Sequence, residues 1–179
     1  MEELKEVKKV GEDNSIKLFK DKFPDAVKAT HKQDTEEHWD FIVNGKKIEL
    51  KAHKSYAGRD YPPEYHRVTV EGVNNFGKES WVFGEADIIC MLMDEEFILV
   101  DRPKLEKYVR RVFPPTNQVV YQKHIKNTWY QRKHIHGKHY PHDTFGWINL
   151  VDMKDMIIDR IPVSYTSIGI KLVTEFTKK

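Results

Sequence analysis

Two acids and a lysine near an Asn-Gly dipeptide are the residues of this sequence best suited to catalysis. Asp40 lies four residues before Asn44-Gly45, and Glu49 and Lys51 lie four and six residues after it. Asn-Gly between two short apolar alternations predicts a two-residue type I′ hairpin, because both central residues must take φ > 0. That turn predicts that Asp40 faces Glu49 across the two strands.

The same register predicts which side chains share a face of the hairpin. The expected cross-strand pairs are Val43 with Lys46, Ile42 with Lys47, and Phe41 with Ile48. One face, expected to be the core face, carries Trp39, Phe41, Val43, Ile48 and Leu50, and the other carries Asp40, Ile42, Glu49 and Lys51. A four-residue loop would instead place Asp40 opposite Lys51 and offset the two acids by one pair.

Two carboxylates opposite each other, about 5 Å apart at Cβ, repel and destabilise a hairpin. A divalent cation removes that repulsion, and Mg²⁺ typically takes one or two carboxylates together with water and phosphate oxygens. Lys51 follows on the same face, where it could hold an attacking water or offset charge that builds on a phosphate. The pattern indicates metal-assisted hydrolysis of a phosphodiester.

Asp40 followed by Glu49-Leu50-Lys51 resembles the Asp…(Asp/Glu)-x-Lys signature of the PD-(D/E)XK nuclease superfamily. The resemblance covers roughly residues 10 to 110, with Trp39 where the family name has proline. It implies an endonuclease that uses Mg²⁺, with Mn²⁺ as a substitute, and that acts on DNA; a homodimer is compatible with it. Asp40 and Glu49 would then be metal ligands, Lys51 a catalytic residue, and Glu12 an acid that supports the site from a preceding helix.

The surrounding periodicities predict the elements that position these residues. Helices are expected over about 12–22 and 101–113, and strands over 25–30, 66–74, 86–93, 97–100 and 168–176, with a strand from 145 that leads into a helix starting at Asp152. The expected fold is α/β, with a mixed central sheet flanked by helices and a restriction-endonuclease-like core. We expect this core to span residues 1–113, with residues 114–179 as a C-terminal extension packed on the same domain.

Several residues outside the hairpin are candidates for binding the substrate. They are Lys54 and Arg59 in the loop after Lys51, Lys78 and Trp81 before the next apolar strand, and Arg110 and Arg111 at the end of the second helix. Trp81 could stack on a base or pack on the core edge, and packing is the usual fate of a large aromatic residue. Glu71 is expected near the site, whereas Asp34, Glu36 and Glu37 read as a solvated connection rather than as further ligands.

A basic region supports an alternative function. From Arg102 to His142, ten lysines and arginines stand against one glutamate, a difference of +9, and Tyr121, Trp129 and Tyr130 lie among them. Such interleaving suits a non-catalytic nucleic-acid-binding module, although it equally suits the rim of a small domain. His134, His136, His139 and His142 could ligate zinc, but no cysteine accompanies them, and a cationic substrate loop is favoured.

Composition limits the cellular setting. The 179 residues are 39% hydrophobic and 32% charged, with a net charge of +2, which is typical of a globular domain. No apolar run approaches a membrane span, and the chain starts without an apolar signal region. The single Cys90 reads as a buried core residue. We expect a cytoplasmic protein with no membrane association.

Overall fold

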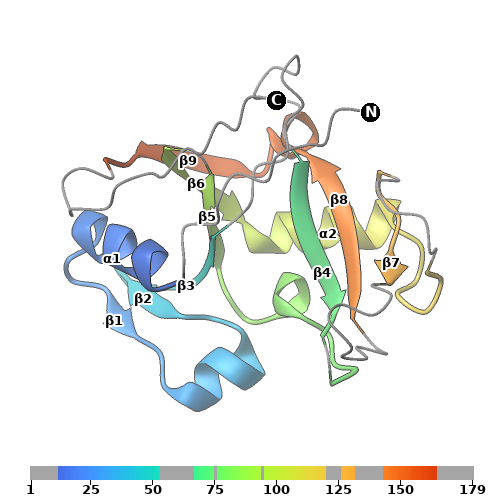
Figure 1. Cartoon of the computed structure of the whole chain (residues 1–179), viewed down its shortest axis with the longest axis horizontal. Coiled ribbons are helices and arrows are strands. Elements are labelled where there is room, and N and C mark those ends of the chain that lie inside the picture. The colour runs from blue at the N-terminus through green and yellow to red at the C-terminus, as the bar shows by residue number, and fades with distance from the viewer. Residues whose placement is uncertain are drawn as a thin grey trace, which may run out of the picture.

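The computed structural model of the chain contains two β-sheets and two α-helices in the parts that it describes (Figure 1). The described residues are 12–52, 67–74, 76–93, 95–119, 126–131 and 143–164. The elements are α1 (Glu12–Lys22), β1 (Val27–Lys28), η1 (Gln33–Glu37), β2 (Phe41–Val43), β3 (Lys46–Ala52), β4 (Arg67–Val73), η3 (Trp81–Phe83), β5 (Ile88–Met93), β6 (Glu96–Asp101), α2 (Arg102–Val112), β7 (Tyr130–Gln131), β8 (Thr144–Asn149), η4 (Leu150–Met153) and β9 (Ile157–Pro162).

The larger sheet has six strands in the order β1-β2-β3-β5-β6-β9. It is mixed, because β3 and β5 run parallel while the other neighbours run antiparallel. The predicted mixed central sheet is therefore confirmed. Parallel neighbours need a long crossover, which is usually a helix. Here the crossover instead passes through β4 and η3, which places the smaller sheet and the segment before β5 next to the β2–β3 hairpin.

Helix α1 covers one face of the larger sheet. Its Leu18 and Phe19 are buried against Phe41 and Ile48 of the hairpin and against Cys90 of β5. Cys90 is a free, buried thiol, as predicted, and burial raises its pKa. The helix begins and ends close to the predicted positions, since Pro24 follows it and its apolar side chains recur at helical spacing.

The other face of the larger sheet packs against α2 and the smaller sheet. Strand alternation sends Ile89 and Met91 to this side, where they join Leu105 and Val109 of α2. Helix α2 begins as predicted, because the Asp101 side chain caps it by accepting a hydrogen bond from the Lys104 amide at 2.9 Å. The sheet is thus covered on both faces, with the two helices on opposite sides.

The smaller sheet has three antiparallel strands in the order β4-β8-β7. After β8, the helix predicted from Asp152 is wrong: the chain makes one 3₁₀ turn, η4, and then forms β9. Ile157 and Ile158 are β-branched and suit a strand, and β6 offers an open edge on which Ile157 pairs with Val100. The strand predicted over 168–176 lies outside the described residues.

No helix in the described ranges is both long and apolar enough to cross a lipid bilayer.

Candidate active site

The hairpin that carries the candidate residues forms as the Asn-Gly turn predicts. Asn44 and Gly45 have φ values of 49° and 75°, and Phe41, Ile42 and Val43 pair with Ile48, Lys47 and Lys46. The Lys47 amide also donates to the Asp87 carboxylate at 2.9 Å, which anchors the hairpin to the start of β5. The predicted register is confirmed for these pairs.

Asp40 does not form the cross-strand pair that the sequence predicts. Strand β2 begins at Phe41, so Asp40 lies one residue outside the ladder. Its amide donates to the Ile48 carbonyl at 2.8 Å, and its Oδ2 accepts a hydrogen bond from the Leu50 amide at 2.6 Å. The Asp40 carboxylate thereby takes the place of a backbone acceptor, which fixes the acid directly against β3.

Asp40 is held where its ionisation is unfavourable. Burial is the main cause, and the negative charge of Glu49 adds to it, so the pKa of Asp40 rises to about 7. The hydrogen bond from Leu50 and the charge of Lys51 lower this pKa, but they do not offset the rise. A cation bound at Asp40 would favour the ionised carboxylate and so lower this pKa.

Glu49 is a buried carboxylate with one unsatisfied oxygen. Its neighbours Ile48 and Leu50 point to the α1 side of the sheet, so Glu49 points to the opposite side, where only 3% of it is exposed. Oε1 lies 2.5 Å from the Lys51 ammonium, whereas Oε2 is buried without a hydrogen-bond partner among the described residues. Burial raises the pKa of Glu49, and Lys51 opposes that rise.

Lys51 lies between an acid and an aromatic ring. Its side chain is 31% exposed, and its Nζ lies 5.7 Å from the ring centroid of Trp81. Burial lowers the pKa of Lys51, but the charges of Glu49 and Asp40 outweigh burial and leave this pKa raised. The ammonium therefore stays charged, and it can meet solvent or a phosphate.

The acids fit a cation that keeps part of its coordination for water or substrate. No group of three or more His, Cys, Asp and Glu side chains in the described ranges could hold a metal ion by protein ligands alone. The unsatisfied Glu49 Oε2 and the protonation-prone Asp40 are nonetheless two carboxylate groups that gain from a nearby positive charge. Mg²⁺ suits this arrangement, because it commonly takes only one or two protein carboxylates.

The structure describes only some of the other predicted site residues. Glu12 starts α1, but its side chain lies outside the described residues, as do Lys54 and Arg59. Trp81 is only 5% exposed and packs in the core, which agrees with the packing interpretation rather than with base stacking. It still takes part in the site through the ammonium over its ring.

The arginines predicted to bind substrate lie on α2. Arg110 contacts Glu106 at 2.8 Å and lies over the Phe83 ring, with its guanidinium carbon 4.3 Å from the centroid. Arg111 is exposed, with its guanidinium carbon 5.8 Å from the Tyr108 ring centroid. Both remain near the surface, although Arg110 is partly neutralised.

The segment from Glu79 to Trp81, which includes the predicted site residue Trp81, lies beside the acids and contacts Glu71 and Lys51. The Ser80 hydroxyl donates a short hydrogen bond to Glu71, so the acid expected near the site is clamped there. The charge of Glu71 acts on the pKa of both Glu49 and Lys51, which agrees with that expectation. Asp34, from the connection expected to be solvated, also raises the pKa of Glu49.

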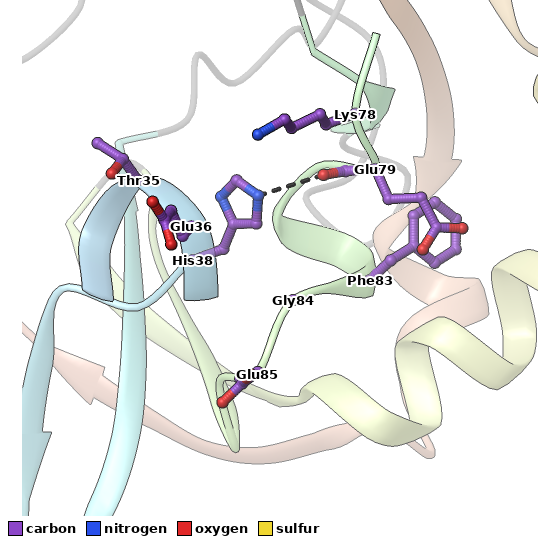
Figure 2. Close-up of a pocket in the computed structure, with 8 residues that line it drawn as sticks. All are labelled: Thr35, Glu36, His38, Lys78, Glu79, Phe83, Gly84 and Glu85. Atoms are coloured by element: carbon purple, nitrogen blue, oxygen red, sulfur yellow. Dashed lines mark hydrogen bonds between the residues drawn. The ribbon is translucent and has the colours of Figure 1, made fainter. Parts of the chain in front are cut away.

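His38 lies beside a hollow of about 440 Å³ next to these residues (Figure 2). Its ring Nε2 lies 3.2 Å from the Glu79 carbonyl oxygen, which can only accept, so Nε2 carries the proton. Burial lowers the pKa of His38. The hollow is lined by Thr35, Glu36, His38, Lys78, Glu79, Phe83, Gly84 and Glu85. Sequence reasoning missed His38; its position two residues before Asp40 was the available signal.

In the described part of the basic region, several residues that were expected to face a nucleic acid instead make contacts within the protein. Arg102 donates to the Ala86 carbonyl at 2.6 Å and pairs with Glu106 at 2.5 Å, so it anchors α2 rather than facing a ligand. Trp129 and Tyr130 are both buried. Tyr121 and the histidine cluster from 134 to 142 lie outside the described residues.

Comparison of the chain with models of protein families, with curated proteins and with solved structures finds no match. The geometry of the site is therefore the basis for a function.

Proposed function

We propose that this protein is a metal-dependent nuclease that hydrolyses phosphodiester bonds in DNA, as an endonuclease. The observation that carries the proposal is the buried Glu49 Oε2 without a partner, next to an Asp40 that burial and Glu49 keep from ionising readily. Buried carboxylates in such surroundings destabilise a fold unless something charged satisfies them. Groups with strongly shifted pKa values are typical of functional sites.

Asp40 and Glu49 would hold Mg²⁺, or Mn²⁺ in its place. The ion would supply positive charge to the phosphodiester oxygens and lower the pKa of a coordinated water. The Leu50 amide orients Asp40, and Lys51 occupies only one oxygen of Glu49, so the second oxygen is free to act as a ligand. Glu12, at the start of α1, would support the site.

Lys51 would stabilise the charge that develops on the phosphate. Its ammonium stays protonated and is partly exposed, and the Trp81 ring limits where it can move. Preorganised cations of this kind are effective because they need no reorganisation during the reaction. Lys51 could alternatively orient the attacking water, and both roles predict that its removal lowers the rate.

DNA as the substrate and a restriction-endonuclease-like core follow from the resemblance to the PD-(D/E)XK superfamily. The order of helix, strand, tight turn and strand that accompanies the resemblance is the order of α1, β2, the Asn44-Gly45 turn and β3, which supports this proposal. Residues 1–113 would be that core, and residues 114–179 an extension. Lys78, Arg110 and Arg111 are surface cations that could contact the DNA backbone near the site.

The test is cleavage of linear, branched and single-stranded DNA with Mg²⁺, with Mn²⁺ and with chelator. We expect metal-dependent cutting that falls by about 100-fold or more in Lys51→Ala, since removing one preorganised charge typically costs that much. Glu49→Gln should abolish cutting while it preserves binding. Lys46→Ala is the matched control, because Lys46 is exposed on the same hairpin and away from the acids.

Cutting that survives both Glu49→Gln and Lys51→Ala would refute the proposed site. If the folded protein cuts nothing but binds DNA in a salt-dependent way, the protein is instead a non-catalytic nucleic-acid-binding module.

A further inference from the structure

Phe76 is an aromatic side chain displayed to solvent in the turn that precedes the Glu79–Trp81 segment of the candidate site. It is 84% exposed, and the other large hydrophobic residues that are exposed in the described ranges, Val27, Val151 and Ile158, are all aliphatic. Single exposed hydrophobic residues are common on protein surfaces. Phe76 therefore needs further support from its surroundings before it indicates binding.

Hydrogen bonds to Asn74 hold the described residues around Phe76. The Asn74 side-chain oxygen accepts hydrogen bonds from the amides of Phe76 at 3.0 Å and Lys78 at 3.1 Å. The Asn74 amide donates to the Lys78 carbonyl at 2.9 Å, and Gly77 takes φ = 75°, a conformation that favours glycine. The Phe76 amide is thus tied to the Asn74 side chain, which limits the backbone entropy that is lost when the ring meets a ligand.

The same turn leads directly into the Glu79–Trp81 segment of the candidate site. The residues that follow it are Glu79, which bonds to His38, Ser80, which bonds to Glu71, and Trp81, which lies under the Lys51 ammonium. Lys78 lines the hollow near His38, as Figure 2 shows, and it makes no ion pair with a described residue. An aromatic ring and a cation with no ion-pair partner among the described residues therefore stand two residues apart, directly before the Glu79–Trp81 segment.

We propose that Phe76 is a stacking platform for an unpaired base, with Lys78 contacting the adjacent phosphate. The inference rests on the proposed nuclease function and specifies its substrate as DNA with a single-stranded part. Bases inside a duplex already stack on both faces, whereas an unpaired base has a free face for an aromatic ring. The Trp81 ring cannot provide this contact, because it is buried in the core.

The test measures binding in the presence of chelator, so that cleavage does not interfere. The probes are a short single-stranded oligonucleotide and its duplex, each with a fluorescent adenine analogue whose emission falls on stacking. Phe76→Ala should weaken single-strand binding by about 5- to 100-fold and remove the quenching, since a stacked base contributes about that much. Phe76→Trp should keep both. Lys78→Ala should weaken binding less and reduce its salt dependence.

Ile158→Ala is the matched control, because Ile158 is an exposed hydrophobic residue on β9, an edge strand of the larger sheet, whereas Phe76 follows β4 of the smaller sheet. An unchanged single-strand affinity in Phe76→Ala, or an equal loss on duplex and single strand, would overturn the platform. Metal-dependent cutting by the wild-type protein would still support the nuclease in that case. Conversely, quenching without any cutting would support the platform and refute the nuclease.

Discussion

Asp40 and Glu49 are both placed where ionisation is unfavourable: burial raises the pKa of each, and the charge of Glu49 adds to the rise at Asp40. A fold selected for stability alone would avoid a buried acid beside a partly buried one, because replacing such groups by neutral ones commonly stabilises a protein. Asp40 nonetheless has a dedicated donor in the Leu50 amide, and Glu49 has the Lys51 ammonium. This specific support for an unfavourable arrangement is typical of a site that is built for binding.

The first prediction concerns stability and pH. The pKa of Asp40 rises from its ordinary value of 3.8 to about 7, so between these values the folded state holds more protons than the unfolded state. The free energy of unfolding should therefore fall as pH rises through this range. Asp40→Asn keeps an acceptor for Leu50 but removes the charge, and it should be about 1 to 3 kcal/mol more stable than wild type above pH ~7.

Urea unfolding at several pH values measures this difference. Near the ordinary pKa of 3.8, where Asp40 is protonated in the fold, the two proteins should be nearly equal in stability. Asp159→Asn, at an exposed position on β9, is the control. Parallel pH profiles for wild type and Asp40→Asn would show that the raised pKa is not present.

The second prediction concerns the cation. Mg²⁺ that binds only the folded state should stabilise the wild-type protein, by about 2.7 kcal/mol when its concentration is a hundred times the dissociation constant. Glu49→Gln should lose most of this gain, because it removes a ligand from the buried carboxylate pair. The gain in wild type should increase with pH through about 7, since Asp40 must ionise to bind.

Thermal unfolding with and without Mg²⁺ measures the effect. Equal shifts in wild type and Glu49→Gln would mean that Mg²⁺ binds elsewhere on the chain.

Among the elements, the connection from η1 to β2 is held against the segment before β5. His38 has φ = 58°, which is unusual for a residue with a side chain, and its Cβ lies where the backbone of Gly84 comes close. The Glu85 amide donates to the Glu37 carbonyl at 2.7 Å, and Lys47 bridges the Glu37 and Glu85 carboxylates at 3.3 and 2.8 Å. These contacts fix the position of the backbone just before Asp40.

The third prediction follows from this contact. A Cβ added at Gly84 would lie 2.6 Å from His38 Cβ and 2.9 Å from the Glu37 carbonyl oxygen, and neither atom can move without moving backbone. Gly84→Ala should therefore destabilise the protein by about 1 to 3 kcal/mol and shift Asp40, which lowers cleavage further than the loss of stability explains.

Gly45→Ala separates the two causes of strain, because a Cβ there meets nothing within 4 Å although φ is +75°. It should lose about 1 kcal/mol through the backbone alone. Urea unfolding and cleavage assays compare the two variants. Wild-type stability in Gly84→Ala would mean that the two segments can separate freely.

The sequence predicts best the elements that are set by interactions between residues close together in the chain. The hairpin turn and α2 depend on neighbours in the chain, an Asn-Gly turn and an Asp101 cap, and both form as predicted. The expected pair of Asp40 with Glu49 does not form, because β2 begins only at Phe41. The helical turn before His38 and the strand β9 depend on tertiary partners and were missed. Trp81 and Trp129 were ambiguous for the same reason: whether an aromatic residue is buried depends on which distant strands cover it.

At the scale of the whole molecule, the two sheets share one core. Ile89 and Met91 of the larger sheet belong to the same cluster as Val70 of β4 and Ile148 of β8. The C-terminal residues supply β8 to the smaller sheet and β9 to the edge of the larger one. The candidate site lies where the crossover brings the smaller sheet to the hairpin, so it depends on both sheets being in place.

The fourth prediction tests whether residues 1–113 can stand as a core without residues 114–179. Truncation after Phe113 would leave β6 and β4 each without its described C-terminal partner strand, and it would remove the buried side chains of Trp129, Ile148, Leu150, Met153 and Met156 from the shared core. Each large buried side chain typically contributes about 1.5 to 3 kcal/mol, so the loss of these five is comparable to the whole net stability of an ordinary domain. Exposed strand edges should also promote aggregation.

We therefore expect the fragment to lack cooperative unfolding and metal-dependent cleavage, as measured by circular dichroism and nuclease assays beside the full chain. A soluble fragment that unfolds cooperatively and cuts DNA would show instead that the core is independent and that the C-terminal strands only extend it.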